Sequence, residues 1–170
     1  KEEEILRWQP GSKALEQVKN LPSFDYRDGF YFLKGRDDLI KKRLSRKRNS
    51  VGKLFLARKS AFALASVPGV KMVALTGSLA MNNAKSEADI DLLIITAGER
   101  LWLTRLSVYC LLILTGLPVR RAGKKATKDR LCLNIWLDEK NLAWPREDRN
   151  IYTAHEIAQI VPLMDKNDFY

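Results

Sequence analysis

The chain has 170 residues, and its hydrophobic share of 46% and charged share of 29% are those of a folded globular protein, which excludes a disordered chain. That length fits one ordinary domain, or one domain with a small appendage. The net charge of +10 favours polyanionic partners such as nucleic acid or nucleotides, although a lysine-rich solubility surface gives the same charge.

The N-terminal segment, residues 1–35, predicts helices followed by a hairpin. Residues 1–20 have a helical pattern in two pieces. Asp28-Gly29 then lies between two aromatic runs, which is typical of two strands joined by a tight turn. We interpret this segment as a partial winged-helix-like element, although any small α+β appendage would have the same pattern.

Residues 36–67 predict a basic connecting helix that ends before Pro68. Six basic residues lie within positions 41–48, so that three or four of them face any one side of the helix. Such a row is long enough to lie along a phosphate backbone, and a solvated connecting helix is the alternative. The residues that we expect to bind nucleic acid or phosphate here are Lys41, Lys42, Arg46 and Lys47.

Residues 68–170 predict the main domain, an α+β unit in which a mixed sheet is flanked by helices that pack mainly on one side. The expected strands are 70–75, 89–96 and 131–137. The expected helices are 99–116 and 153–161, and residues 79–84 are expected to form a short helix or a turn. The most apolar run, 106–114, is shorter than the roughly 20 residues that cross a bilayer. We therefore expect a buried helix and no membrane association.

A basic loop follows over residues 120–130. It could neutralise a polyphosphate or an RNA acceptor, and it could equally be a solvated loop. The phosphate-binding candidates in this loop are Arg120, Arg121, Lys124 and Lys125.

The two cysteines, Cys110 and Cys132, each lie inside an apolar run. Cysteine in such a run usually behaves as a small hydrophobe. Because neither a disulfide framework nor a metal-type spacing is present, we expect a cytoplasmic protein with reduced thiols.

Two short segments combine the residue types that phosphate chemistry needs. An apolar strand runs into Gly77-Ser78, and after ten residues Asp89 and Asp91 enter the next apolar strand. Residues i and i+2 of a strand share a face, so the two carboxylates lie side by side and favour a divalent cation between them. Glycine lets a phosphate approach the backbone, and the Ser78 hydroxyl with nearby N–H groups can hold a triphosphate tail.

This combination resembles the DNA polymerase beta-like nucleotidyltransferase superfamily, whose signature is a hydrophobic residue, Gly-Ser, about ten residues and Asp-x-Asp. The resemblance covers about residues 68–138. It implies that Ser78 contacts the triphosphate and that Asp89 and Asp91 bind two magnesium ions. The segments that look like a little-characterised prokaryotic group, often with a winged-helix-like segment in front, are 70–84, 131–134 and 152–157.

The sequence departs from the superfamily pattern at the third carboxylate, which usually lies on a later strand. In the strand 131–137 the polar interior residue is Asn134, which cannot act as a base near neutral pH. Asp138 and Glu139 lie at the end of that strand. Besides Asp89 and Asp91, the candidate catalytic residues are therefore Asp138 and Asn134. Either Asp138 or Glu139 substitutes for the third carboxylate, or the enzyme is weak, or the protein binds nucleotide without turnover.

We therefore expect a magnesium-dependent nucleotidyltransferase that moves a nucleoside monophosphate from a nucleoside triphosphate to an acceptor hydroxyl on RNA, DNA or protein. The alternative is a weak or inactive nucleotidyltransferase-fold module that binds nucleotide or nucleic acid. The acceptor, the preferred base and the oligomeric state do not follow from the sequence.

Overall fold

The computed structural model describes residues 22–120, 127–166 and 168–169. The chain divides into two compact units, Lys1–Ser45 and Arg46–Tyr170. The domain boundaries expected after residues 35 and 67 stay a prediction. The expected features that lie outside the described residues are the helices within 1–20 and the loop residues Arg121, Lys124 and Lys125.

The first unit contains a hairpin of two antiparallel strands, β1 (Phe24–Arg27) and β2 (Phe30–Leu33). Asp28 and Gly29 join them with φ angles of 53° and 79°. Positive φ at both central residues is the geometry of a type I′ turn, whose twist matches that of the paired strands. The hairpin expected at this Asp-Gly pair is therefore confirmed.

Helix α3 (Asp38–Ala65) begins in the first unit and continues into the second. It confirms the helix expected between the hairpin and Pro68. Within the second unit Ala57, Ala61 and Leu64 are fully buried. Their spacing of four and three residues forms one apolar stripe along the helix.

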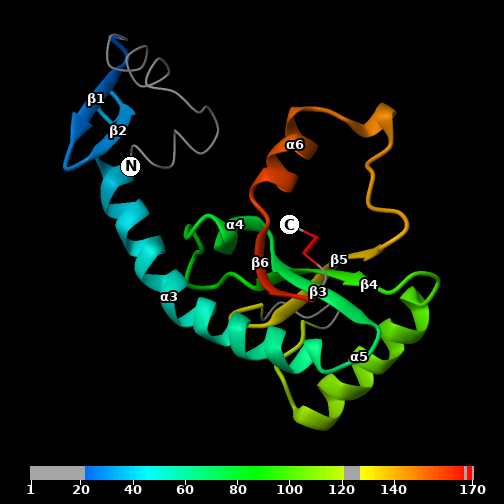
Figure 1. Ribbon diagram of the computed structural model, residues 1–170. Coiled ribbons are helices and arrows are strands. Elements are labelled where there is room, and N and C mark those ends of the chain that lie inside the picture. The colour runs from blue at the N-terminus through cyan, green and yellow to red at the C-terminus, as the bar shows by residue number, and fades with distance from the viewer. Residues whose placement is uncertain (1–21, 121–126, 167, 170) are drawn as a thin grey trace. The chain divides into compact units, whose positions relative to one another are not determined.

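The second unit is built on a mixed sheet of four strands, β3 (Val70–Leu75), β4 (Ile90–Thr96), β5 (Leu131–Asp138) and β6 (Val161–Asp165). Their order in the sheet is β5-β4-β3-β6 (Figure 1). β3 is antiparallel to both of its neighbours, and β4 is parallel to β5. This mixed sheet with its flanking helices confirms the expected fold class.

Strand β6 was not expected, because Pro162 interrupts its apolar run. Proline cannot donate a hydrogen bond to a strand ladder and is tolerated only at sheet edges and bulges. β6 forms an edge of this sheet, and its register against β3 shifts between the pairs Val73–Met164 and Ala74–Pro162. The proline thus lies where the ladder is already irregular.

Helices cover one face of the sheet more completely than the other. The second half of α3 and helix α5 (Leu101–Thr115) pack on the same face. Leu64 of α3 and Val108 of α5 join Val73 and Ile94 of the sheet in the larger hydrophobic cluster. The smaller cluster on the opposite face contains Met72, Ala74, Leu93 and Ile95.

Helix α5 contains the most apolar run of the chain, yet only one side of it is buried. Val108 and Leu112 face the sheet, whereas Leu106, Ile113 and Leu114 are 62%, 79% and 84% exposed. The expectation of a buried helix is therefore wrong, because only one side of α5 meets the sheet. Within the described ranges, no helix combines the length and apolarity that crossing a membrane requires.

Alternation along β4 directs its acidic side chains away from α3 and α5. Ile90, Leu92 and Ile94 belong to the larger cluster beneath those helices. Asp89 and Asp91 alternate with them and therefore project from the opposite face. The candidate site lies on that face.

A bulge in β5 changes the face that its later residues present. Residues 92 and 93 of β4 pair with residues 133 and 135 of β5, which leaves Asn134 as the extra residue. Before the bulge, Cys132 pairs with Asp91 and shares its face. Beyond the bulge the alternation is inverted, so that Trp136 packs against the helix-side cluster.

Candidate active site

The turn after β3 places Gly77 directly against one of the two acids. Gly77 has a φ of 61° and begins the short helix α4 (Gly77–Ala80). A Cβ added to it would lie 2.7 Å from Asp91 Oδ2, closer than two such atoms can approach. The Thr76 N–H also donates to the Asp91 carbonyl oxygen at 3.1 Å. Glycine is therefore required here by both the backbone conformation and the space.

Ser78 follows Gly77 with an exposed side chain. It is therefore accessible to a ligand, next to the residue that contacts the Asp91 carboxylate. The structure thus brings together the two segments that the sequence analysis singled out, the Gly-Ser turn and the pair of acids.

Asp89, Asp91 and Cys132 form one cluster at the start of β4 and β5. One ligand atom from each residue can be chosen so that all three lie within 4.8 Å of one another. All three side chains are half-buried. Two carboxylate oxygens and a sulfur at this spacing are able to coordinate a metal ion.

The electrostatic environment of Asp91 favours a cation. Burial raises the pKa of the Asp91 carboxyl above its usual value, and the charge of Asp89 raises it further. Both effects disfavour a second negative charge at this position. A cation bound between the two acids would remove that penalty.

Arg120 supplies a positive charge to the same cluster. Its Nη1 donates to Asp89 Oδ2 at 2.7 Å and lies 3.9 Å from Cys132 Sγ. The backbone N–H of Arg120 donates to the Leu131 carbonyl oxygen at 2.9 Å, which holds this segment beside the start of β5. Of the four predicted phosphate-binding residues of the loop, Arg120 is the one within the described residues.

Cys132 was expected to behave as a small hydrophobe, and its surroundings are instead polar. Burial raises the pKa of the Cys132 thiol, the charge of Asp91 raises it further, and the hydrogen bond from Arg120 opposes both. The pairing of Cys132 with Asp91 depends on the parallel alignment of two strands that lie about 40 residues apart in sequence. No local pattern in the apolar run could have shown it.

Glu156 is a further acid near the site that was not predicted from the sequence. It lies on helix α6 (Ile151–Ala158), and its charge is among the causes that raise the pKa of Asp91. Thr153 and Glu156 are half-buried, whereas their neighbours in the helix are exposed. This spacing of three residues is that of one helix face directed toward the body of the unit.

Asp138, predicted as a catalytic residue, is not brought to the cluster. Asp138 pairs with Thr96 at the other end of the strands, about 20 Å from Cys132 along β5. Asp138 Oδ2 accepts from the Glu99 N–H at 2.6 Å, and Asn134 is the exposed bulge residue. The bulge also inverts the alternation that was expected to keep Asn134 and Asp138 on one face of the sheet. The position of Asp138 does not favour a role at the cluster, whereas the role of Asn134 stays a prediction.

Glu139, the other acid considered at the end of β5, also serves the loop that follows β4. Its Oε1 accepts from the Gly98 N–H at 2.8 Å, and its Oε2 lies 4.0 Å from Lys71 Nζ. These contacts tie the end of β5 to β3 and to the entry of α5.

The basic residues predicted on the connecting helix all lie on α3. Lys41 and Lys42 belong to the first unit and are exposed. In the second unit Lys47 is exposed, while Arg46 is half-buried and donates to Asn83 Oδ1 at 3.5 Å. Binding of nucleic acid along this helix stays a prediction.

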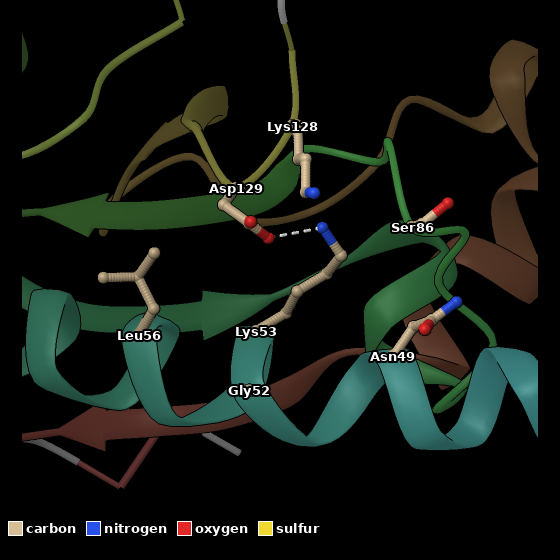
Figure 2. A pocket seen from close by; sticks show the side chains of 7 residues that line it. All are labelled: Asn49, Gly52, Lys53, Leu56, Ser86, Lys128 and Asp129. Atoms are coloured by element: carbon tan, nitrogen blue, oxygen red, sulfur yellow. Dashed lines mark hydrogen bonds and ion pairs between the residues drawn. The ribbon is translucent and has the colours of Figure 1, made fainter.

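A buried lysine holds the starts of β4 and β5 together (Figure 2). Lys53 reaches from α3, and its Nζ donates to the Ala88 carbonyl oxygen at 2.7 Å and to Asp129 Oδ1 at 2.6 Å. Ala88 directly precedes Asp89, and Asp129 lies two residues before β5. Lys53 therefore positions both strands on which the cluster depends, beside a pocket of about 400 Å³.

Comparison with known protein families matches residues 58–163 to the family described as a nucleotidyltransferase domain. The match covers well over half of the chain and includes the Gly-Ser turn, both acids and Cys132. Comparison with curated proteins and with solved structures gave no significant match.

Proposed function

The chain belongs to the nucleotidyltransferase domain family, and from this membership we propose that it is a magnesium-dependent enzyme that moves a nucleoside monophosphate from a nucleoside triphosphate to an acceptor hydroxyl. The contact of Gly77 with the Asp91 carboxylate is the observation that supports this proposal most directly. It places a bare stretch of backbone, where a phosphate can approach, beside acids that suit a metal.

The donor set at the cluster fits the metal that the proposal requires. Asp89 and Asp91 offer carboxylate oxygens, the ligands that magnesium prefers in proteins, and they would hold the two expected ions. Magnesium bound there neutralises charge on the transferring phosphoryl group. The raised pKa of Asp91 has its cause in burial and in repulsion by Asp89, both of which a cation would offset.

The remaining residues of the site serve the phosphates. We assign Gly77 and the Ser78 hydroxyl to the triphosphate, which approaches across the backbone beside Asp91. Arg120 pairs with Asp89, and its guanidinium would contact a phosphate once cations occupy the carboxylates. Arg121, Lys124 and Lys125 stay proposed phosphate-binding residues of the same loop.

A catalytically weak module that binds nucleotide or nucleic acid is the second candidate. It is favoured by the residue that β5 places beside Asp91, which is the thiol of Cys132 and not a carboxylate. In this function the Gly-Ser turn and the two acids bind nucleotide. The basic residues of α3 bind nucleic acid, namely Lys41, Lys42, Arg46 and Lys47. Binding of that kind weakens steeply as the salt concentration rises.

A transfer assay separates the two candidates. The chain is incubated with labelled nucleoside triphosphates, magnesium and pooled RNA, DNA or protein acceptors under reducing conditions such as those of the cytoplasm. The enzyme transfers label to an acceptor, and the Asp89→Ala/Asp91→Ala variant does not. Nucleotide binding measured in parallel by calorimetry identifies the binding module, because binding without transfer to any acceptor contradicts the enzyme.

A further inference from the structure

We propose that Cys132 is a metal ligand of this site and that its sulfur makes the site bind thiophilic divalent cations, zinc above all, more tightly than magnesium. The inference rests on the proposed function in one respect, that Asp89 and Asp91 hold a cation. It adds a regulatory property to that site, since zinc would compete with magnesium for the same carboxylates.

The first support is the position of the sulfur. Cys132 pairs with Asp91 across the parallel strands, ahead of the bulge, and so projects from the same face. Its sulfur and the two carboxylates lie within 4.8 Å of one another. Zinc binds sulfur at about 2.3 Å and carboxylate oxygen at about 2.0–2.2 Å, so small side-chain rotations would let one ion reach all three.

The second support is the cation that already bridges two of these groups. One nitrogen of Arg120 lies 2.7 Å from Asp89 Oδ2 and 3.9 Å from Cys132 Sγ. A positive charge is thus accommodated between the carboxylate and the sulfur. Arg120 is half-exposed, so it can turn toward solvent when an ion takes its place.

The preference follows from the chemistry of the donors. Magnesium favours oxygen ligands, whereas thiolate sulfur selects softer ions such as zinc and cadmium. On binding, the Cys132 thiol loses its proton to solvent and a sulfur–metal bond forms, so that no oxidant or reductant is needed. Cys110 provides a contrast, because it lies exposed on α5, away from both acids.

Cobalt reports the sulfur ligand directly. We expect titration of the whole chain with cobalt to produce a near-ultraviolet absorption band from sulfur-to-cobalt charge transfer. Cys132→Ser should abolish that band, and Cys110→Ser should retain it. A band that survives in Cys132→Ser would overturn the proposal, as would its absence from the unchanged chain.

Calorimetry tests the preference itself. Cys132→Ser should lower the zinc affinity about tenfold or more while changing the magnesium affinity less than about threefold. Cys132→Asp should shift the preference toward magnesium. An unchanged ratio of zinc to magnesium affinity in both variants contradicts the proposal. Circular dichroism verifies folding, and Cys132→Ala replaces Cys132→Ser if the latter unfolds.

These measurements can fail independently of the proposed function. A cobalt band that depends on Cys132, in a chain that transfers no nucleotide, would support the ligand and contradict the enzyme. Magnesium-dependent transfer in a chain that gives no cobalt band would support the enzyme and contradict the ligand.

Discussion

The pair of strands β4 and β5 has two acids at its first end and two at its far end, and the two pairs of acids have different surroundings. At the first end Asp89 and Asp91 lie beside each other and a thiol, and the pKa of Asp91 is raised. At the far end Asp138 and Glu139 accept N–H groups from the segment that follows β4. Backbone donors stabilise a carboxylate and fix a loop, whereas neighbouring acids repel and are available to a cation. Placement, and not residue type, separates the two roles.

Removal of the acids at each end gives the largest expected difference. The Asp89→Ala/Asp91→Ala variant should lose about 10³-fold or more of the transfer rate, because both carboxylate ligands are gone. The matched variant at the far end, Asp138→Ala/Glu139→Ala, should keep the rate within about threefold. Transfer of labelled nucleotide measures both. Equal losses at the two ends would remove the distinction between them.

Gly77→Ala tests the contact between the turn and the first end. The new Cβ would displace the Asp91 carboxylate, and a displacement of that size can cost about 100-fold in rate. Gly116→Ala is the matched control, since Gly116 has a similar φ of 65° but no atom within 4 Å of an added Cβ. Both changes should cost about 1–2 kcal/mol of stability, and only Gly77→Ala should affect transfer. Equal transfer rates in the two variants would show that the contact is unimportant.

Lys53→Met tests whether Lys53 stabilises the segments that precede β4 and β5. It leaves the Ala88 carbonyl oxygen and Asp129 without their shared donor, and we expect a loss of about 1–3 kcal/mol in the free energy of unfolding. Urea denaturation followed by circular dichroism measures this loss. Lys59→Met, at an exposed position of the same helix, should change stability by less than about 0.5 kcal/mol. Similar midpoints for the two variants would contradict the role of Lys53.

The smallest expected effect is on the free energy of unfolding of the metal-free protein. It tests whether the ionised Asp91 side chain stabilises or destabilises the fold. Its pKa is raised on folding from the ordinary 3.8, so its ionised form destabilises the metal-free fold above that raised value, and the cost disappears as the pH falls through it. Asp91→Asn should therefore stabilise the metal-free protein at pH 7 by roughly 0.5–1 kcal/mol. Asp138→Asn should destabilise it, because an amide oxygen replaces only one of two acceptors. Urea denaturation in the presence of a chelator measures the change in the free energy of unfolding for each variant. Two changes of the same sign would contradict the expected difference between Asp91 and Asp138.

Much of the local structure could be read from the sequence. The Asp28-Gly29 turn, the strands beside Gly77 and Asp91 and the helix α5 follow from turn chemistry and from the periodicity of apolar residues, which act over a few neighbours. The proximity of the Gly-Ser turn to the acids could also be expected, because antiparallel strands β3 and β4 follow one another in the chain.

What the sequence by itself determined is therefore the pair of acids and the glycine turn, since strand alternation places residues i and i+2 on one face. Only the tertiary structure determined which residue of β5 lies beside the two acids. Cys132 meets Asp91 through a parallel pairing of distant segments, and the bulge at Asn134 turns Asp138 to the opposite face of the sheet. Register and bulges depend on the packing of the whole sheet, which no local pattern encodes.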